Sequence, residues 1–171
     1  MIARLASADL RTRFGTFHEV LYYDGRTQSH ALVMGDVREG EELLCRVHSS
    51  CIFGHHFNSV ECDCREQMEQ AQARIQAAGC GVVIWLEQEG KGNGHYALLQ
   101  SIAHKRAGLA QGDAYEAVGF ARDARDYRAA AAILQDLGVR SIRLLTNNPD
   151  KVDTLTRHGV VVQGTEPLKV K

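Results

Sequence analysis

Proline, tryptophan and long apolar runs are scarce in this chain. Its 171 residues contain two prolines and one tryptophan, and we find no low-complexity tract or internal repeat. Because domain linkers tend to be rich in proline, glycine or polar residues, we predict a single domain over residues 1–171. The best apolar run, CGVVIWL at 80–86, is far shorter than the roughly 20 residues of a membrane span, so no membrane association is expected.

An excess of either charge is also missing. The formal net charge is −1, whereas a broad nucleic-acid-binding face needs a basic excess, so we expect no nucleic-acid partner. A few local cations can still bind a small anionic ligand. The five cysteines, an odd number in a chain without a recognisable signal peptide, predict a protein of the reducing cytoplasm.

The first fifty residues carry three strand patterns. Residues 15–23 alternate well enough for a strand, and Asp24-Gly25 marks the turn that follows. Residues 30–37 and 43–48 read as two more strands, joined by the polar turn REGEE. Consecutive strands with short connections predict a β meander in this part of the chain.

Helices and strands alternate in the remainder. A helical pattern starts at Asp63, with Met68 and Ile75 on its apolar face, and Gly79 is a good terminator. The later predicted elements are a strand at 80–86, helices at about 95–108 and 127–137, a strand at 139–145, a helix at 149–158 and a short strand at 160–164. This alternation predicts an α/β fold with a layered mixed sheet.

The stretch from Cys45 to Cys64 holds four of the five cysteines. Cys51, Cys62 and Cys64 have a spacing that fits a metal site, and three thiolates leave the fourth position of a tetrahedral zinc ion open, as in catalytic sites. The alternatives are buried apolar thiols, a redox dithiol or part of a four-cysteine structural site. We interpret Cys45 and Cys80 as core thiols beside predicted strands.

Two helix starts are candidate sites for charge. Cys62 and Cys64 fall at the start of the helix after Asp63, where the positive end of the helix dipole favours thiolate over thiol. Thr146 and Lys151 flank the start of the helix at Pro149, where anions are favoured. A capping threonine and a solvated lysine explain the second pair equally well.

Several segments together resemble GTP cyclohydrolase II, an enzyme of riboflavin synthesis. The matching segments are RVHSSC at 46–51, CDC at 62–64 with Gln67, QEGKGNG at 88–94, GFARDARDY at 119–127 and LLTNNPDKV at 144–152. They follow the family's order and cover nearly the whole chain. The resemblance implies hydrolytic opening of the imidazole ring of GTP at C8 and release of pyrophosphate with the help of Mg²⁺.

The resemblance also implies roles for individual residues. Cys51, Cys62 and Cys64 look like the zinc ligands, Asp123 matches the proposed general base, and Arg125 matches the proposed nucleophile toward the α-phosphate. The residues that would face the nucleotide are Arg46, Val47, His48, Ser49, Ser50, Gln67, Glu89, Gly90, Lys91, Gln111, Thr146 and Lys151. By the same analogy the protein would be a homodimer.

The chain departs from the family at several of these positions. The family usually has glutamate at Ser50, arginine at Lys91 and a catalytic tyrosine at Ile102. Lysine cannot make a bidentate phosphate contact, and isoleucine has no proton to donate. Loss of the tyrosine predicts a product that keeps its formyl group, which would suit specialised metabolism better than bulk riboflavin supply.

Other readings remain open. Ser50, Lys91, His55 and His95 could adapt the same chemistry to a different purine nucleotide, and a zinc-containing nucleotide-binding protein without turnover is a third possibility. His48, His55 and His56 are candidates for a fourth metal ligand. We interpret His48 as part of the pocket wall and expect the two loop histidines to be solvent-exposed or to lie behind the ligands.

Overall fold

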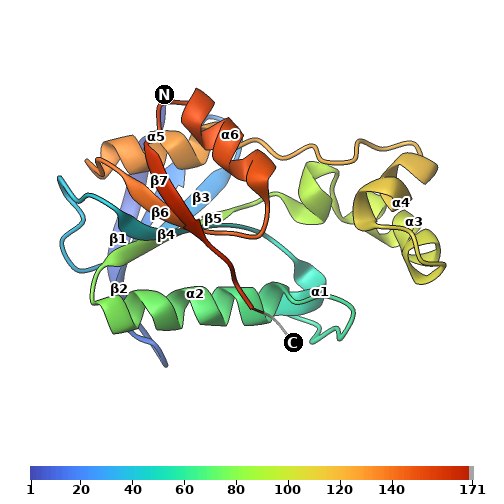
Figure 1. Cartoon of the computed structure of the whole chain (residues 1–171), viewed down its shortest axis with the longest axis horizontal. Coiled ribbons are helices and arrows are strands. Elements are labelled where there is room, and N and C mark those ends of the chain that lie inside the picture. Colours follow the sequence, from blue (N-terminus) through green and yellow to red (C-terminus); the bar gives the residue numbers. More distant parts are fainter. Residues whose placement is uncertain (170–171) are drawn as a thin grey trace.

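A computed structural model describes residues 1–169, and its framework is a seven-stranded mixed sheet (Figure 1). The strands are β1 (Ala3–Thr12), β2 (Gly15–Tyr23), β3 (Gln28–Met34), β4 (Leu43–Ser49), β5 (Gly81–Leu86), β6 (Ile142–Leu145) and β7 (Val162–Glu166). Their order across the sheet is β1-β2-β3-β5-β4-β6-β7. The predicted α/β fold with a mixed sheet is therefore confirmed. The predicted domain of 1–171 includes residues 170 and 171, which lie outside the described residues.

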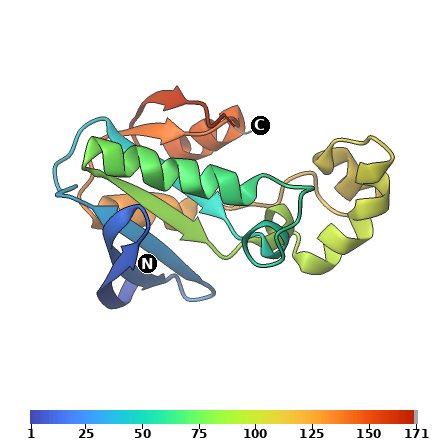
Figure 2. The same ribbon diagram turned by 90° about the horizontal axis from the view of Figure 1, so that it is seen from below.

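Six α-helices and one 3₁₀ turn complete the described part of the chain. They are α1 (Ile52–His55), α2 (Cys64–Ala78), η1 (Glu89–Gly92), α3 (His95–Arg106), α4 (Gln111–Ala117), α5 (Arg128–Asp136) and α6 (Pro149–Arg157). Helix α2 covers one face of the sheet, and α5 and α6 cover the other (Figure 1). Helices α3 and α4 pack on each other and extend from one end of the sheet (Figure 2).

The layers are held by separate apolar clusters on the two faces of the sheet. Ile133 of α5 and Leu155 of α6 pack with Ile84 on one face. Ile75 of α2 packs with Phe17 and Val83 on the other. Successive side chains of a strand point to opposite faces, so β5 must be apolar throughout to serve both clusters. This explains the run at 80–86 that the sequence predicted as a buried strand. No helix in residues 1–169 has the length and apolar character needed to cross a membrane.

The predicted meander is only partly correct. Strands β1, β2 and β3 are antiparallel neighbours, but β4 lies between β5 and β6 and runs parallel to both. The connection from β4 to β5 contains α2, and a helical crossover returns the chain in the parallel direction. Strand β5 fills the place beside β3 that the meander would have given to β4.

Strand β1 had no counterpart in the predictions. It forms one edge of the sheet, and nearly all of its residues are exposed on both faces, so it lacks the apolar alternation that reveals a half-buried strand. The Arg4 guanidinium donates a 2.6 Å hydrogen bond to Asp136, which also accepts a 2.7 Å bond from the Tyr22 hydroxyl. These contacts attach the N-terminal strand to α5.

The carboxyl ends of the three central parallel strands meet at one edge of the sheet. Strand β4 leads to Cys51, β5 leads to η1, and β6 leads to Thr146 and α6. Helix α2 starts at this edge as well, and Gly79 ends it in the left-handed conformation, with φ 73°. In open α/β sheets ligands bind beyond the carboxyl ends of the strands, so this edge is where a site is expected.

Candidate metal and nucleotide site

Three cysteine sulfurs from two elements converge at this edge. The Sγ atoms of Cys51, Cys62 and Cys64 all lie within 4.8 Å of one another, and those of Cys51 and Cys62 are 3.7 Å apart. A tetrahedral zinc ion with Zn–S bonds of about 2.3 Å separates its sulfur ligands by about 3.8 Å. The geometry therefore fits zinc. Within residues 1–169 this is the one cluster of three or more metal-ligating side chains.

The electrostatics of the three thiols also fit a cation. The hydrogen bond from the Cys64 thiol lowers the pKa of Cys51 to about 6, and the Gly54 N–H contributes to this at 3.4 Å from the sulfur. The same bond and burial raise the pKa of Cys64, and burial raises that of Cys62. One thiolate thus forms at the expense of its neighbours, and three can coexist only beside a positive ion.

A glycine and an arginine hold the metal-binding loop against α2. A Cβ atom at Gly54 would lie 2.9 Å from the Cys62 sulfur, so only glycine fits without displacing the cluster. Arg65 of α2 donates hydrogen bonds of 3.0 Å to the carbonyl groups of Gly54 and His55. These contacts hold the short helix α1, which was predicted as a loop, against α2. Cys51 therefore lies beside Cys62.

The two remaining cysteines take no part in the cluster. Cys45 is fully buried in β4, as predicted for a core thiol. The same prediction for Cys80 is wrong, because this residue lies just before β5 and is partly exposed, and its thiol donates to the Asp36 carbonyl at 3.1 Å. Neither joins the other three, which argues against a four-cysteine structural site.

A cavity of about 300 Å³ opens beside the cysteines. Most of the predicted site residues line it: Arg46, His48, Ser49, Ser50, Cys51, Cys62, Cys64, Gln67, Glu89, Gly90, Lys91, Gln111, Arg125 and Lys151. Asp123 stands behind Arg125 and accepts a 2.9 Å hydrogen bond from its Nε. Segments that are far apart in the sequence thus contribute to one chamber.

Val47 and Thr146 do not line this cavity. The Val47 side chain points into the core, as the alternation of β4 requires, and only its carbonyl oxygen serves the site by accepting a 2.8 Å hydrogen bond from Lys151. Thr146 is buried, and its hydroxyl accepts the Asn148 N–H at 3.0 Å in the turn before α6. The N-cap of α6 is Asn148, whose side chain accepts the Asp150 N–H, so the capping role for Thr146 is wrong.

Two buried cations face the cavity. Arg46 is 6% exposed and donates to the Leu145 carbonyl at 2.9 Å and to the Gln67 side chain at 2.5 Å. Lys151 is 3% exposed, so the solvated-lysine interpretation is wrong. In residues 1–169 neither forms an ion pair with a carboxylate. Burial lowers the pKa of Arg46 to about 10 and that of Lys151 well below its ordinary value. A bound anion would stabilise both charges.

A histidine pair adjoins Arg46, whose guanidinium lies 3.2 Å from the His48 ring. The Nε2 atoms of His48 and His55 are 3.1 Å apart, and His48 is buried. Burial and the charge of Arg46 lower the pKa of His48 well below its ordinary value, so this ring is neutral. His48 lines the cavity as predicted, and His56 is exposed. None of the three histidines belongs to the cysteine cluster.

The glycine-rich loop ties the metal-binding loop to the Asp123–Arg125 segment. The Glu89 carboxylate accepts the Ile52 N–H at 3.0 and 3.2 Å, directly after Cys51. Two residues further on, the Lys91 carbonyl accepts the Ala124 N–H at 2.9 Å. Lys91 itself has a left-handed backbone with φ 53°, which is uncommon for a residue with a side chain. The loop is therefore a shared support for both halves of the site.

Several cavity residues were missed by sequence reasoning. They are Phe53, Ser59, Glu61, Asp63, Leu98, Lys105 and Tyr115. Tyr115 lies on α4, in a stretch where no element was predicted, and nothing in the local pattern singles it out. Ile102, noted earlier as a departure from the family, also lines the cavity from α3.

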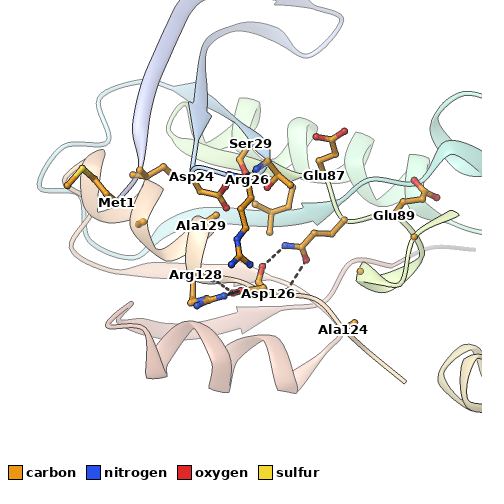
Figure 3. A pocket seen from close by; sticks show the side chains of 17 residues that line it. Met1, Asp24, Arg26, Ser29, Glu87, Glu89, Ala124, Asp126, Arg128 and Ala129 are labelled. Carbon is orange, nitrogen blue, oxygen red and sulfur yellow. Dashed lines mark hydrogen bonds and ion pairs between the residues drawn. The ribbon is translucent and has the colours of Figure 1, made fainter. Parts of the chain in front are cut away.

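A second cavity of about 820 Å³ lies on the other side of the glycine-rich loop (Figure 3). Two of its carboxylates already have partners, since Asp24 accepts the backbone N–H groups of Arg26 and Thr27, and Asp126 pairs with Arg128. The Gln88 side chain exchanges hydrogen bonds of 2.6 and 3.1 Å with the backbone of Asp126. This cavity is larger but has neither cysteines nor unpaired buried cations, so the cysteine-lined cavity is the stronger candidate site.

Comparison with known proteins identifies the family of this chain. Residues 3–167 match the protein family described as GTP cyclohydrolase II. The chain is 42% identical over 172 residues to "Riboflavin biosynthesis protein RibBA" of Bacillus cereus, covering 99% of this chain and 43% of that protein. It is 40% identical over 171 residues to the RibBA protein of Endomicrobium trichonymphae, covering 99% of this chain and 42% of that protein. The chain therefore spans less than half the length of these curated relatives.

One solved structure resembles the fold. It is the crystal structure of RibBX, "a two domain 3,4-dihydroxy-2-butanone 4-phosphate synthase from A. baumannii", with a TM-score of 0.54 and 22% sequence identity. The match covers 96% of this chain and 40% of that one. At this level of identity the similarity is evidence for the fold alone.

Proposed function

Because the chain belongs to the GTP cyclohydrolase II family, we propose that it opens the imidazole ring of GTP at C8 by zinc-dependent hydrolysis and releases pyrophosphate. The observation that carries this proposal is the cysteine cluster at the cavity that also holds Arg46 and Lys151. Zinc bound by the three thiolates would supply a Lewis acid and an activated water. Binding of the phosphates also requires positive charge, which Arg46 and Lys151 provide.

The cationic residues would hold the triphosphate. Arg46 and Lys151 lie at the floor of the cavity, and Lys91 lies on the glycine-rich loop. The two buried cations have no carboxylate partner, and phosphate oxygens would supply the negative charge that stabilises them. Mg²⁺ would enter with the nucleotide, since this ion is usually held by substrate phosphates and few protein ligands.

Asp123 and Arg125 fit a phosphate clamp. Burial lowers the pKa of Arg125. The hydrogen bond and the charge of Asp123 raise it by a larger amount, so the pKa lies above its ordinary value. A guanidinium that keeps its proton is a strong donor to phosphate and a poor nucleophile. We therefore favour charge stabilisation at the phosphates over the nucleophilic role that the resemblance implies for Arg125.

The identity of residue 102 bears on the product. Ile102 lines the cavity where the family usually has a tyrosine, and its side chain offers no donor for expelling formate. We propose that the ring-opened product keeps the formyl carbon. A protein of this kind would act as a homodimer in the cytoplasm, and its product would enter riboflavin synthesis or a specialised pathway that branches from it.

A second substrate is favoured by one observation. The hydroxyl groups of Ser49 and Ser50 are buried and have no hydrogen-bond partner in residues 1–169. Both residues line the cavity, so a ligand with a matching polar group would satisfy them. A purine nucleotide other than GTP could carry that group, and the hydrolytic chemistry would be unchanged.

Mass spectrometry of the products tests the proposal. The zinc-loaded protein is incubated with GTP and Mg²⁺, with the Cys62→Ser variant as the control that lacks a metal ligand. A ring-opened nucleotide that retains its formyl carbon supports the full proposal, and stoichiometric formate refutes formyl retention. If GTP is unchanged, a panel of purine nucleotides separates an altered substrate from a protein that only binds.

A further inference from the structure

A buried tyrosine with a free hydroxyl lies in the wall of the cavity. Tyr115 of α4 is 1% exposed, yet it lines the cavity beside the cysteines. Its hydroxyl makes no hydrogen bond to any residue in 1–169. A buried phenol normally finds a protein partner, so an unpaired hydroxyl at a cavity wall is available to a ligand.

The position of the phenol places it close to the reacting groups. A Cβ atom added at Gly90 would lie 3.4 Å from the Tyr115 hydroxyl, so the phenol reaches the glycine-rich loop. Gly90 follows Glu89, whose carboxylate holds the N–H of Ile52 beside Cys51. Burial raises the pKa of Tyr115 to about 12, and the nearby charges of Glu89 and Cys51 act in the same direction. The phenol therefore keeps its proton at neutral pH.

Several other proton donors of the cavity are occupied. His48 contacts Arg46 at 3.2 Å and His55 at 3.1 Å. Gln111 donates to Ser101 at 2.9 Å, and Lys105 donates to the Glu61 carbonyl at 2.9 Å. The hydroxyl groups of Ser49 and Ser50 are also free, but a phenol is a much stronger acid than an aliphatic hydroxyl, so Tyr115 is the better proton donor among them.

We propose that Tyr115 is a catalytic residue that donates the proton needed by the purine nitrogen leaving C8. The inference rests on the proposed function. Water adds across the double bond between C8 and N7, so that C8 gains a hydroxyl group and N7 gains a hydrogen. The bond from C8 to the other ring nitrogen, N9, then breaks, and its electron pair stays on N9. The nitrogen takes the phenol proton, and the phenolate regains a proton through solvent from the hydroxyl group that the added water left on C8. The net change is addition of one water molecule, and no oxidant or reductant is needed.

The Tyr115→Phe variant tests this role against a matched control. The change removes one oxygen that has no protein partner, so packing and the cysteine cluster should be unaffected. We expect kcat for ring opening of GTP to fall by about 10²- to 10⁴-fold, the usual contribution of a positioned proton donor, with KM and zinc content close to wild type. Tyr96→Phe removes a hydroxyl from a residue that is 68% exposed, and it should leave kcat unchanged.

The outcomes separate this inference from the proposed function. If wild-type protein opens GTP and Tyr115→Phe does so within threefold of its rate, the proton-donor role is overturned and the proposed function stands. If wild-type protein does not open GTP, both are overturned. Should the variant fold poorly by circular dichroism, incorporation of 3-fluorotyrosine keeps the fold and lowers the phenol pKa. Activity must then be lost at lower pH than in unlabelled protein, and an unshifted pH profile would count against Tyr115.

Discussion

At the scale of single residues, Lys151 shows how burial changes the chemistry of a side chain. In the first turn of an exposed helix a lysine is ordinarily solvated, but α6 turns this one inward, where its ammonium group donates to the Val47 carbonyl. Burial and the positive charges of Arg46 and Arg125 lower its pKa, and only Asp123 and Cys45 oppose them weakly. A bound anion would oppose these effects and raise the pKa of Lys151 again.

This predicts proton uptake on nucleotide binding. A bound phosphate raises the pKa of Lys151 from its depressed value, so binding takes up protons at any pH between the free and bound pKa values. GTP affinity should consequently fall as pH rises through that window. Isothermal titration calorimetry in buffers of different ionisation enthalpy measures the uptake. Lys151→Met should bind more weakly and without this proton linkage, and an unchanged linkage in the variant would exclude Lys151 as its source.

The metal-binding residues give a second prediction at this scale. Replacing Cys64 by serine removes one of three sulfurs that lie within 4.8 Å of one another, and two thiolates hold zinc much less tightly. After gel filtration, elemental analysis should find about one zinc ion per chain in the wild type and little in Cys64→Ser. Cys80→Ser is the matched control, since this thiol lies outside the cluster and should leave the zinc content unchanged.

The predictability of these residues depends on whether the relevant signal is local. The spacing of Cys51, Cys62 and Cys64 was sufficient to propose a metal site, because one loop and one helix start carry all three. The burial of Lys151 was not predictable, because it depends on β4, far away in the sequence. The same holds for Tyr115, whose place in the cavity follows from the packing of α4 on α3.

At the scale of elements, the turn η1 connects the two halves of the site through close backbone contact. Gly92 has φ +82°, and a Cβ atom there would lie 2.6 Å from the Ala124 carbonyl oxygen. Ala124 sits between Asp123 and Arg125, so the absence of a side chain at 92 determines how near the phosphate clamp can come to the loop. Glycine is needed here for both its backbone conformation and its size.

We therefore expect Gly92→Ala to impair turnover beyond the effect of backbone strain. Gly119 is the matched control, since its φ of +86° is similar but nothing lies within 4 Å of an added Cβ atom. Both variants should lose about 1–2 kcal/mol of stability from the left-handed conformation, but only Gly92→Ala should lower kcat at least tenfold. Steady-state kinetics with thermal melting of both proteins makes the comparison. Equal loss of kcat in the two variants would mean that strain alone is responsible.

Elements were predictable where their amphipathic pattern was strong. Strand β2 was predicted at its observed bounds, and α2 and β5 within one residue at each end, because one-sided or two-sided burial marks them clearly. Helix α4 was missed because it has seven residues and no side-chain N-cap. The place of β4 in the sheet was also missed, since strand order depends on pairing between distant segments and has no local signal.

At the scale of the whole molecule, the metal site lies outside the cores that stabilise the fold. None of the three ligand cysteines belongs to the apolar clusters, which are formed by the sheet with α5 and α6 on one face and α2 on the other. The ligands sit at one end of the sheet: Cys51 precedes α1, Cys62 lies in the loop before α2, and Cys64 begins α2. Such segments open more readily than core strands.

Removal of zinc should therefore loosen one end of the molecule and leave the rest folded. Zinc stabilises the conformation that binds it. We expect the zinc-bound and zinc-free conformations to differ mainly in residues 51–64, which carry the three ligands. Hydrogen exchange followed by mass spectrometry should show faster exchange in this segment after chelation, with unchanged protection in β5, where five of the six residues are buried. The Cys62→Ser variant should reproduce the pattern without chelator. Equal loss of protection in residues 51–64 and in β5 would instead show that the metal stabilises the entire fold, because the sheet would then unfold together with the metal-binding loop.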